Sequence, residues 1–129
     1  MVYSKETAIA EKFEAIVRLG TANSRMKDFY DILYLAEHEE FEAQALAAAI
    51  TTTFTHRGTD LAQSKLIFSE EFKTNRALNE MWTAFLKRSK LGSSILLAET
   101  LTTLEQFLSI AFIPEKGSAK WFIKIQKWQ

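Results

Sequence analysis

Apolar residues recur along most of the chain at intervals of three or four positions, which is the spacing of an amphipathic helix. In residues 5–19 they place Ile9, Phe13 and Ile16 on one face, with Ser4 able to cap the start and Gly20 just past the end. The same periodicity predicts helices over about residues 24–36, 40–54, 75–86 and 94–111. Residues 60–72 follow it less clearly, and we expect a short helix and a loop there.

The end of the chain has a different pattern. Pro114 cannot continue the helix before it, and residues 121–125 alternate as in a short strand or an extended segment packed on the helices. Only four glycines and one proline interrupt the whole sequence. The pattern therefore predicts an all-α fold, a compact bundle of about five or six helices with a short extended C-terminal segment.

With 129 residues, of which 47% are hydrophobic, the chain can form a single helical domain over residues 1–129 with its own core. It has no cysteine, which excludes a disulfide scaffold and a thiolate zinc site and fits a reducing compartment. No stretch approaches the ~20 apolar residues of a membrane span, and residues 1–20 contain no signal-peptide pattern. We expect a cytoplasmic protein with no membrane partner.

The 16 basic and 16 acidic residues balance, with an acidic excess in the first half and a basic excess in the second. This distribution does not indicate the strongly basic face of a nucleic-acid-binding domain. His38 and His56 stand alone, without the spacing of a metal site. We predict no metal-binding residues in this chain.

Lys12 is the first residue with candidate chemistry. On a helical wheel it lies at the edge of the apolar stripe, between Ala8 and Ala15, while Glu14 and Arg18 fall on the opposite side. A lysine at this position must extend its ammonium group to water, find an acidic partner, or be held for a function. The pattern alone leaves these alternatives open.

The segment 25–31 is the second candidate. The i, i+3 spacing places Asp28 and Asp31 on one side of the next helix, turned away from its main apolar stripe. Arg25 can pair with Asp28, and Lys27 with Asp31, and such pairs contribute only about 0.2–0.5 kcal/mol each. The segment is either a solvated, ion-paired helix face or part of a functional site.

Two strings in this region carry a family resemblance. "AEKFEAI" (residues 10–16) followed by "SRMKDFYDI" (residues 24–32) closely resembles the latter half of the AbiEii/AbiGii toxin family of nucleotidyltransferases, the toxins of type IV, abortive-infection toxin–antitoxin systems. The resemblance continues through "ITTTFTHRGTDL" (residues 50–61) and "MWTAFLKRS" (residues 81–89), so it covers nearly the whole chain. The combination of the first two strings is fairly specific to this family.

The resemblance implies a mechanism. Members of the family have a polymerase-β-like nucleotidyltransferase fold, with a glycine/serine phosphate-binding turn and paired aspartates for Mg²⁺ in the N-terminal half. A helical half closes the site, and its motif lysine and aspartate match Lys12 and Asp28 as catalytic residues. By this resemblance Lys12 contacts triphosphate oxygens and Asp28 orients Lys12 or a hydroxyl, while Arg25 and Lys27 assist electrostatically and Asp31 is structural.

The chain starts at Met1, directly before the lysine helix, so we expect the N-terminal catalytic core to be absent. Leu91-Gly92-Ser93 resembles the phosphate-binding turn, but no Asp-x-Asp pair follows it. We therefore expect no cofactor in this chain alone, with Mg²⁺ and a nucleoside triphosphate implied by the family once a core is supplied. The expected partner is an N-terminal nucleotidyltransferase half, and activity without it is not expected.

Two alternatives stay open. The chain could be a non-catalytic helical module that binds an antitoxin protein or associates with itself as a homo-oligomer. It could also bind RNA weakly through Lys120, Trp121, Lys124 and Lys127, by phosphate contacts and base stacking. In the competing interpretation of this last segment, Trp121 and Trp128 dock on the bundle while the lysines face water.

Overall fold

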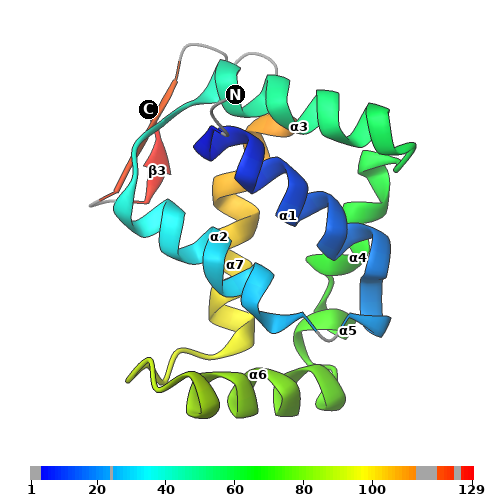
Figure 1. Ribbon diagram of the computed structural model, residues 1–129, viewed down its shortest axis with the longest axis vertical. Helices are drawn as coiled ribbons and strands as arrows, with labels where there is room; N and C mark the ends of the chain where they lie inside the picture. The colour runs from blue at the N-terminus through cyan, green and yellow to red at the C-terminus, as the bar shows by residue number, and fades with distance from the viewer. Residues whose placement is uncertain (1–3, 24, 113–118, 124–125) are drawn as a thin grey trace.

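The computed structural model describes residues 4–23, 25–112, 119–123 and 126–129 (Figure 1). Its α-helices are α1 (Lys5–Leu19), α2 (Met26–His38), α3 (Ala43–Arg57), α4 (Ser64–Ile67), α5 (Glu70–Lys73), α6 (Arg76–Ser89) and α7 (Leu97–Leu108). Short 3-10 turns occupy Gly20–Ala22, Leu61–Gln63 and Ser109–Ala111. The strands are β1 (Phe41–Glu42), β2 (Lys120–Phe122) and β3 (Lys127–Trp128). The prediction of a mainly helical fold is confirmed.

The bounds of α1 match the prediction because its signals are local. Ser4 Oγ accepts a hydrogen bond from the backbone N–H of Thr7 over 3.0 Å, which caps the first turn. At the other end Gly20 has φ 55° and ψ −136°, a conformation that side chains with a Cβ atom disfavour. The chain therefore turns sharply there and leads into α2.

Two predicted boundaries were wrong. The helix expected over residues 40–54 begins only at Ala43, because Phe41 and Glu42 form β1 and pair with β2. The helix expected over residues 94–111 begins at Leu97 and tightens into a 3-10 turn at Ser109. Residues 60–72 contain a 3-10 turn, the one-turn helix α4 and the start of α5 rather than one helix and a loop.

The three strands form a small antiparallel sheet in the order β1-β2-β3. Phe41 of β1 pairs with Trp121, and Trp121 pairs with Trp128 of β3. Both tryptophans are buried, and each indole N–H donates to a backbone carbonyl of a helix, Trp121 to Ala36 and Trp128 to Phe107. The sheet thus fastens the described C-terminal residues onto α2 and α7.

The core lies between α1, α2, α3 and α7, with α7 running behind α2 in the view of Figure 1. The apolar stripe of α1 packs on α3, where the rings of Phe13 and Phe54 have centroids 5.2 Å apart. This contact fixes the rotation of α1 about its axis, so the side of α1 that carries Lys12 faces α2. Among the described helices, none is long and apolar enough to cross a lipid bilayer.

Candidate active site

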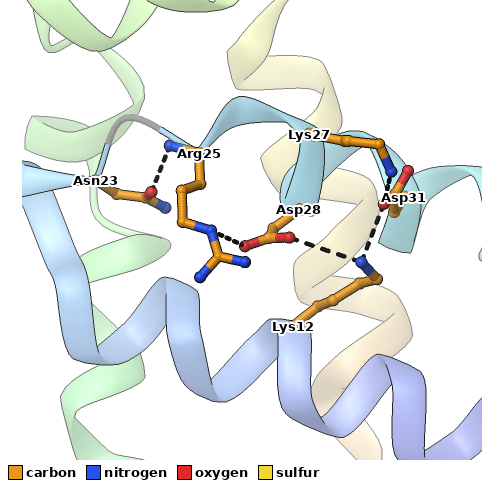
Figure 2. Close-up of polar contacts among 6 residues, drawn as sticks. All are labelled: Lys12, Asn23, Arg25, Lys27, Asp28 and Asp31. Carbon is orange, nitrogen blue, oxygen red and sulfur yellow. Dashed lines mark hydrogen bonds and ion pairs between the residues drawn. The ribbon is translucent and has the colours of Figure 1, made fainter.

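The facing sides of α1 and α2 bring Lys12 together with both aspartates of α2. Lys12 Nζ donates a hydrogen bond to Asp31 Oδ2 over 3.0 Å and lies 3.6 Å from Asp28 Oδ1 (Figure 2). The two helices are joined by the 3-10 turn at Gly20–Ala22, and this short connection keeps them adjacent. Lys12 has therefore found acidic partners rather than extending alone into water.

Asp28 is the buried member of this network. Its side chain is 6% exposed and lies between two cations, with Arg25 Nε 3.2 Å from Oδ2 and Lys12 on the other oxygen. The expected pairing of Arg25 with Asp28 is confirmed. Of the two alternatives for this segment, a solvated helix face does not describe Asp28, because α1 covers that side of α2 and encloses the carboxylate.

Asp31 lies nearer to solvent, with 23% of its side chain exposed, and shares one oxygen between two lysines. Its Oδ2 accepts from Lys27 Nζ over 2.7 Å as well as from Lys12, which confirms the predicted i, i+4 pair. Burial by itself would raise the pKa of Asp31, but the hydrogen bonds and charges of Lys27 and Lys12 outweigh it and hold the pKa below its ordinary value. Asp31 is thus a direct partner of Lys12 and a stable carboxylate at neutral pH.

Asn23 fixes the start of α2. Its side chain is fully buried, and Oδ1 accepts a hydrogen bond from the backbone N–H of Arg25 over 2.7 Å (Figure 2). This bond satisfies one of the N–H groups that the first turn of a helix leaves without an intrahelical partner. The bond fixes the backbone position of Arg25 and so supports the ion pair of its side chain with Asp28.

A cavity of about 280 Å³ opens beside the network, between α1 and the start of α2. Its lining contains four basic and three acidic side chains, namely Lys12, Arg18, Arg25, Arg57, Glu11, Glu14 and Asp28. Each acid has a basic neighbour within 4 Å, the longest pair being Arg57 with Glu11 at 3.9 Å. The cavity is therefore polar, ion-paired and slightly basic, which suits an anionic ligand.

A family model described as "Nucleotidyl transferase AbiEii toxin, Type IV TA system" matches residues 1–108. The chain belongs to this family. The matched segment contains all of α1 to α7 and every residue that lines the cavity. No curated protein and no solved structure matches the chain.

Sequence reasoning missed Glu14 in this AbiEii domain. The helical wheel put it on the side away from the core, whereas its side chain is only 2% exposed. Glu14 Oε2 accepts from Arg18 Nε over 3.1 Å and from Thr59 Oγ1 over 2.6 Å. The i, i+4 spacing of Glu14 and Arg18 was visible in the sequence, but nothing local indicated that Thr59 would cover them.

The aspartates of the AbiEii domain do not fit a Mg²⁺ ion. Lys12, Arg25 and Lys27 already occupy the positions around Asp28 and Asp31 where a divalent cation would bind. Within the described residues, no group of three or more His, Cys, Asp or Glu side chains is arranged to hold a metal ion. Ammonium and guanidinium groups make this site suited to phosphate oxygens instead.

The candidate RNA-binding residues lie elsewhere. Lys120 and Lys127 are exposed on β2 and β3, and Lys124 lies outside the described residues. The prediction that Trp121 stacks on a base was wrong, because its ring is fully buried against Phe107 and Trp128. The competing interpretation, docking of both tryptophans on the bundle, is what the AbiEii domain shows.

Proposed function

We propose that this domain supplies Lys12 to a nucleotidyl-transfer site, acting together with the phosphate-binding turn and metal-binding carboxylates characteristic of the nucleotide-binding half of AbiEii toxins. The observation that carries the proposal is the meeting of Lys12 with Asp28 and Asp31 at the edge of a basic cavity. Membership of the family gives the reaction class.

In nucleotidyl transfer, an acceptor hydroxyl gives up its proton to solvent, and its oxygen forms a bond to the α-phosphorus of a nucleoside triphosphate. The bond from this phosphorus to the bridging oxygen breaks, and pyrophosphate leaves with the electron pair. Negative charge therefore grows on phosphate oxygens in the transition state, where a fixed ammonium group stabilises it. Lys12 is 29% exposed, so its charge acts in a partly desolvated setting and is stronger than on an open surface.

Each aspartate has a second cationic partner, so the ammonium group of Lys12 can leave them and contact a phosphate group. Asp28 keeps Arg25 at 3.2 Å, and Asp31 keeps Lys27 at 2.7 Å, when Lys12 turns away. Neither carboxylate is then left without a cation, so the exchange avoids the cost of a buried unpaired charge. In the proposal, Asp28 and Asp31 are positioning residues that hold the ammonium group at the cavity until the triphosphate arrives.

The test supplies the nucleotide-binding half of an AbiEii toxin in trans, with Mg²⁺, each labelled nucleoside triphosphate and total RNA as acceptor. We expect Lys12→Ala to lower the transfer rate by roughly 100- to 1,000-fold, the usual cost of removing a group that stabilises transition-state charge. The matched control is Lys87→Ala on α6, because Lys87 is exposed and has no ion pair with the other described residues. Transfer that is absent, or equally fast in both variants, contradicts the proposal.

A non-catalytic interaction module is the alternative, with an antitoxin protein or a second copy as its partner. The observation in its favour is a set of large apolar side chains that stay exposed, Tyr34, Leu66, Leu91, Leu96, Phe112 and Phe122. Leu96 alone is 62% exposed. Light scattering separates the two functions, since a module predicts self-association or a stable antitoxin complex with no transfer in any mixture.

A further inference from the structure

Two arginines at the cavity each pair with a buried carboxylate. Arg18 Nε donates a hydrogen bond to Glu14 Oε2 over 3.1 Å, whereas Arg25 Nε forms an ion pair with Asp28 Oδ2 at 3.2 Å without a hydrogen bond. Both carboxylates are buried, with side chains 2% and 6% exposed, while the arginines reach the cavity from α1 and from the residue before α2. A guanidinium group that is bonded through Nε alone keeps both of its Nη groups for another acceptor.

Neither arginine donates a hydrogen bond from its Nη groups within the described part of the chain. Figure 2 shows the Nη atoms of Arg25 on the side of Asp28 that faces α1. A guanidinium fork binds two oxygens of one phosphate group, and its fixed plane makes the bond directional. Two such forks beside Lys12 provide more phosphate donors than one ammonium group can.

Glu14 explains why Arg18 points into the cavity. A buried carboxylate is costly unless it is paired, and Glu14 Oε2 is paired twice, by Arg18 and by Thr59 Oγ1 at 2.6 Å. Thr59 follows α3, so the hydroxyl comes from outside the helix that carries Glu14. Arg18 itself is 47% exposed and would sample many rotamers without this bond.

We propose that Arg18 and Arg25 form an oxyanion subsite for the polyphosphate of a nucleoside triphosphate, and that Glu14, supported by Thr59, is the positioning residue for Arg18. The choice of triphosphate as ligand rests on the proposed function. The two arginines supply hydrogen-bond donors for phosphate oxygens in addition to the ammonium group of Lys12. The role of the buried Glu14 is to hold Arg18 at the cavity. It binds through fixed hydrogen-bond geometry rather than through an excess of charge.

The test titrates the complete chain with inorganic tripolyphosphate at low ionic strength by isothermal calorimetry. We expect Arg18→Gln to raise the Kd about tenfold, through loss of charge-assisted hydrogen bonds. Arg76→Gln is the matched control, because Arg76 Nε makes the same kind of bond, 3.0 Å to Glu80 Oε1, on an exposed face of α6. An unchanged Kd in Arg18→Gln, or an equal change in Arg76→Gln, overturns the subsite.

The variant Glu14→Gln distinguishes a positioning role of Glu14 from a simple effect of net charge, because the two predict opposite changes in the Kd for tripolyphosphate. Removing a negative charge from the cavity wall strengthens anion binding if only the net charge matters. If Glu14 positions Arg18, the same change weakens binding, and we expect the Kd to rise about threefold to tenfold. Loss of folded protein would alter the stoichiometry rather than the Kd, so calorimetry distinguishes the two.

Thr59→Val gives a second variant that leaves the charge unchanged, should Glu14→Gln fail to fold. We expect it to raise the Kd about twofold to threefold, since Glu14 loses one of its two donors. A tripolyphosphate Kd that is unchanged in Thr59→Val, or lower in Glu14→Gln, removes the positioning role.

A single-stranded RNA with a 5′-hydroxyl end distinguishes the source of the phosphate. RNA binding that depends on Arg18, without binding of tripolyphosphate, overturns the subsite in favour of a backbone contact. Transfer that depends on Lys12 but not on Arg18 also overturns the subsite and leaves the proposed function standing. If tripolyphosphate binds through Arg18 but the mixture with the nucleotide-binding half gives no transfer, only the proposed function fails.

Discussion

Trp121 donates its indole N–H to the backbone carbonyl of Ala36 over 2.7 Å, across 85 positions of the chain. Ala36 lies in the last turn of α2, where carbonyl groups have no intrahelical partner. The same helix carries Asp28 and Asp31 in its first two turns. The C-terminal residues that follow the family match therefore complete the end of the helix on which the candidate site is built.

Replacing Trp121 with Phe removes this hydrogen bond and leaves the buried carbonyl of Ala36 without a donor. We expect the free energy of unfolding to fall by about 1–3 kcal/mol, the cost of an unsatisfied buried polar group. Urea denaturation followed by circular dichroism measures it. The control is Phe122→Leu at an exposed position of the same strand, where we expect a change below about 0.5 kcal/mol. Equal losses in the two variants would show that the bond contributes nothing.

Gly20 carries a backbone requirement at the turn between α1 and α2. A Cβ atom there would lie 3.7 Å from Leu66 Cδ2, an ordinary contact, so the cost of Gly20→Ala comes from the backbone angles. We expect a loss of about 1–3 kcal/mol in the free energy of unfolding. Gly58→Ala, at φ 70° and ψ 25°, should cost only about 1 kcal/mol, because residues with side chains do adopt the left-handed helical region. Thermal denaturation that ranks the two variants in the opposite order would contradict this reasoning.

The helices could be predicted where their signals are local. The apolar spacing, Ser4 and Gly20 together define α1, because a helix face and its caps depend only on neighbouring residues. The strand β1 could not be predicted this way. Phe41 pairs with Trp121, 80 positions away, and Phe41 fits the helical periodicity as well as it fits a strand.

The same limit applies to the site. Lys12 and Asp28 were indicated by their motifs, and the structure brings them together. The helical wheel placed Glu14 on the solvent side of α1. A wheel describes the faces of a single helix, so it gives no information on the loop after α3 that packs over Glu14. Thr59 closes over Glu14 from beyond α3, and that contact turns an apparently solvated carboxylate into a buried one.

Lys12→Ala should cost little stability, which makes it a clean variant for activity measurements. Arg25 still pairs with Asp28 and Lys27 with Asp31, so we expect a loss of about 0.5–1 kcal/mol in the free energy of unfolding. The double variant with Arg25→Ala leaves the buried Asp28 with no cation. We expect it to cost about 1–2 kcal/mol more than the two single changes together, as measured by a double-mutant cycle in urea. Additive losses would mean that the two cations do not share Asp28.

Asp31 makes the stability of the domain depend on pH in a defined direction. Hydrogen bonds and charges from Lys27 and Lys12 overcome the effect of burial and keep the folded-state pKa below the ordinary value, while the unfolded chain has a pKa of about 3.9. A lowered folded-state pKa stabilises the fold fully above the unfolded pKa. This contribution is lost as the pH falls through the folded-state pKa.

Asp31→Asn measures this contribution directly. We expect the variant to be about 0.5–1 kcal/mol less stable than the natural chain at pH 6, with a difference that shrinks as the pH falls below about 4. The control is Glu37→Gln, because Glu37 is an exposed acid of the same helix that has no ion pair with the other described residues. Its difference from the natural chain should stay near zero at each pH. A difference for Asp31→Asn that stays constant or grows in acid would mean that Lys12 and Lys27 do not stabilise the carboxylate, and the network would lose its electrostatic basis.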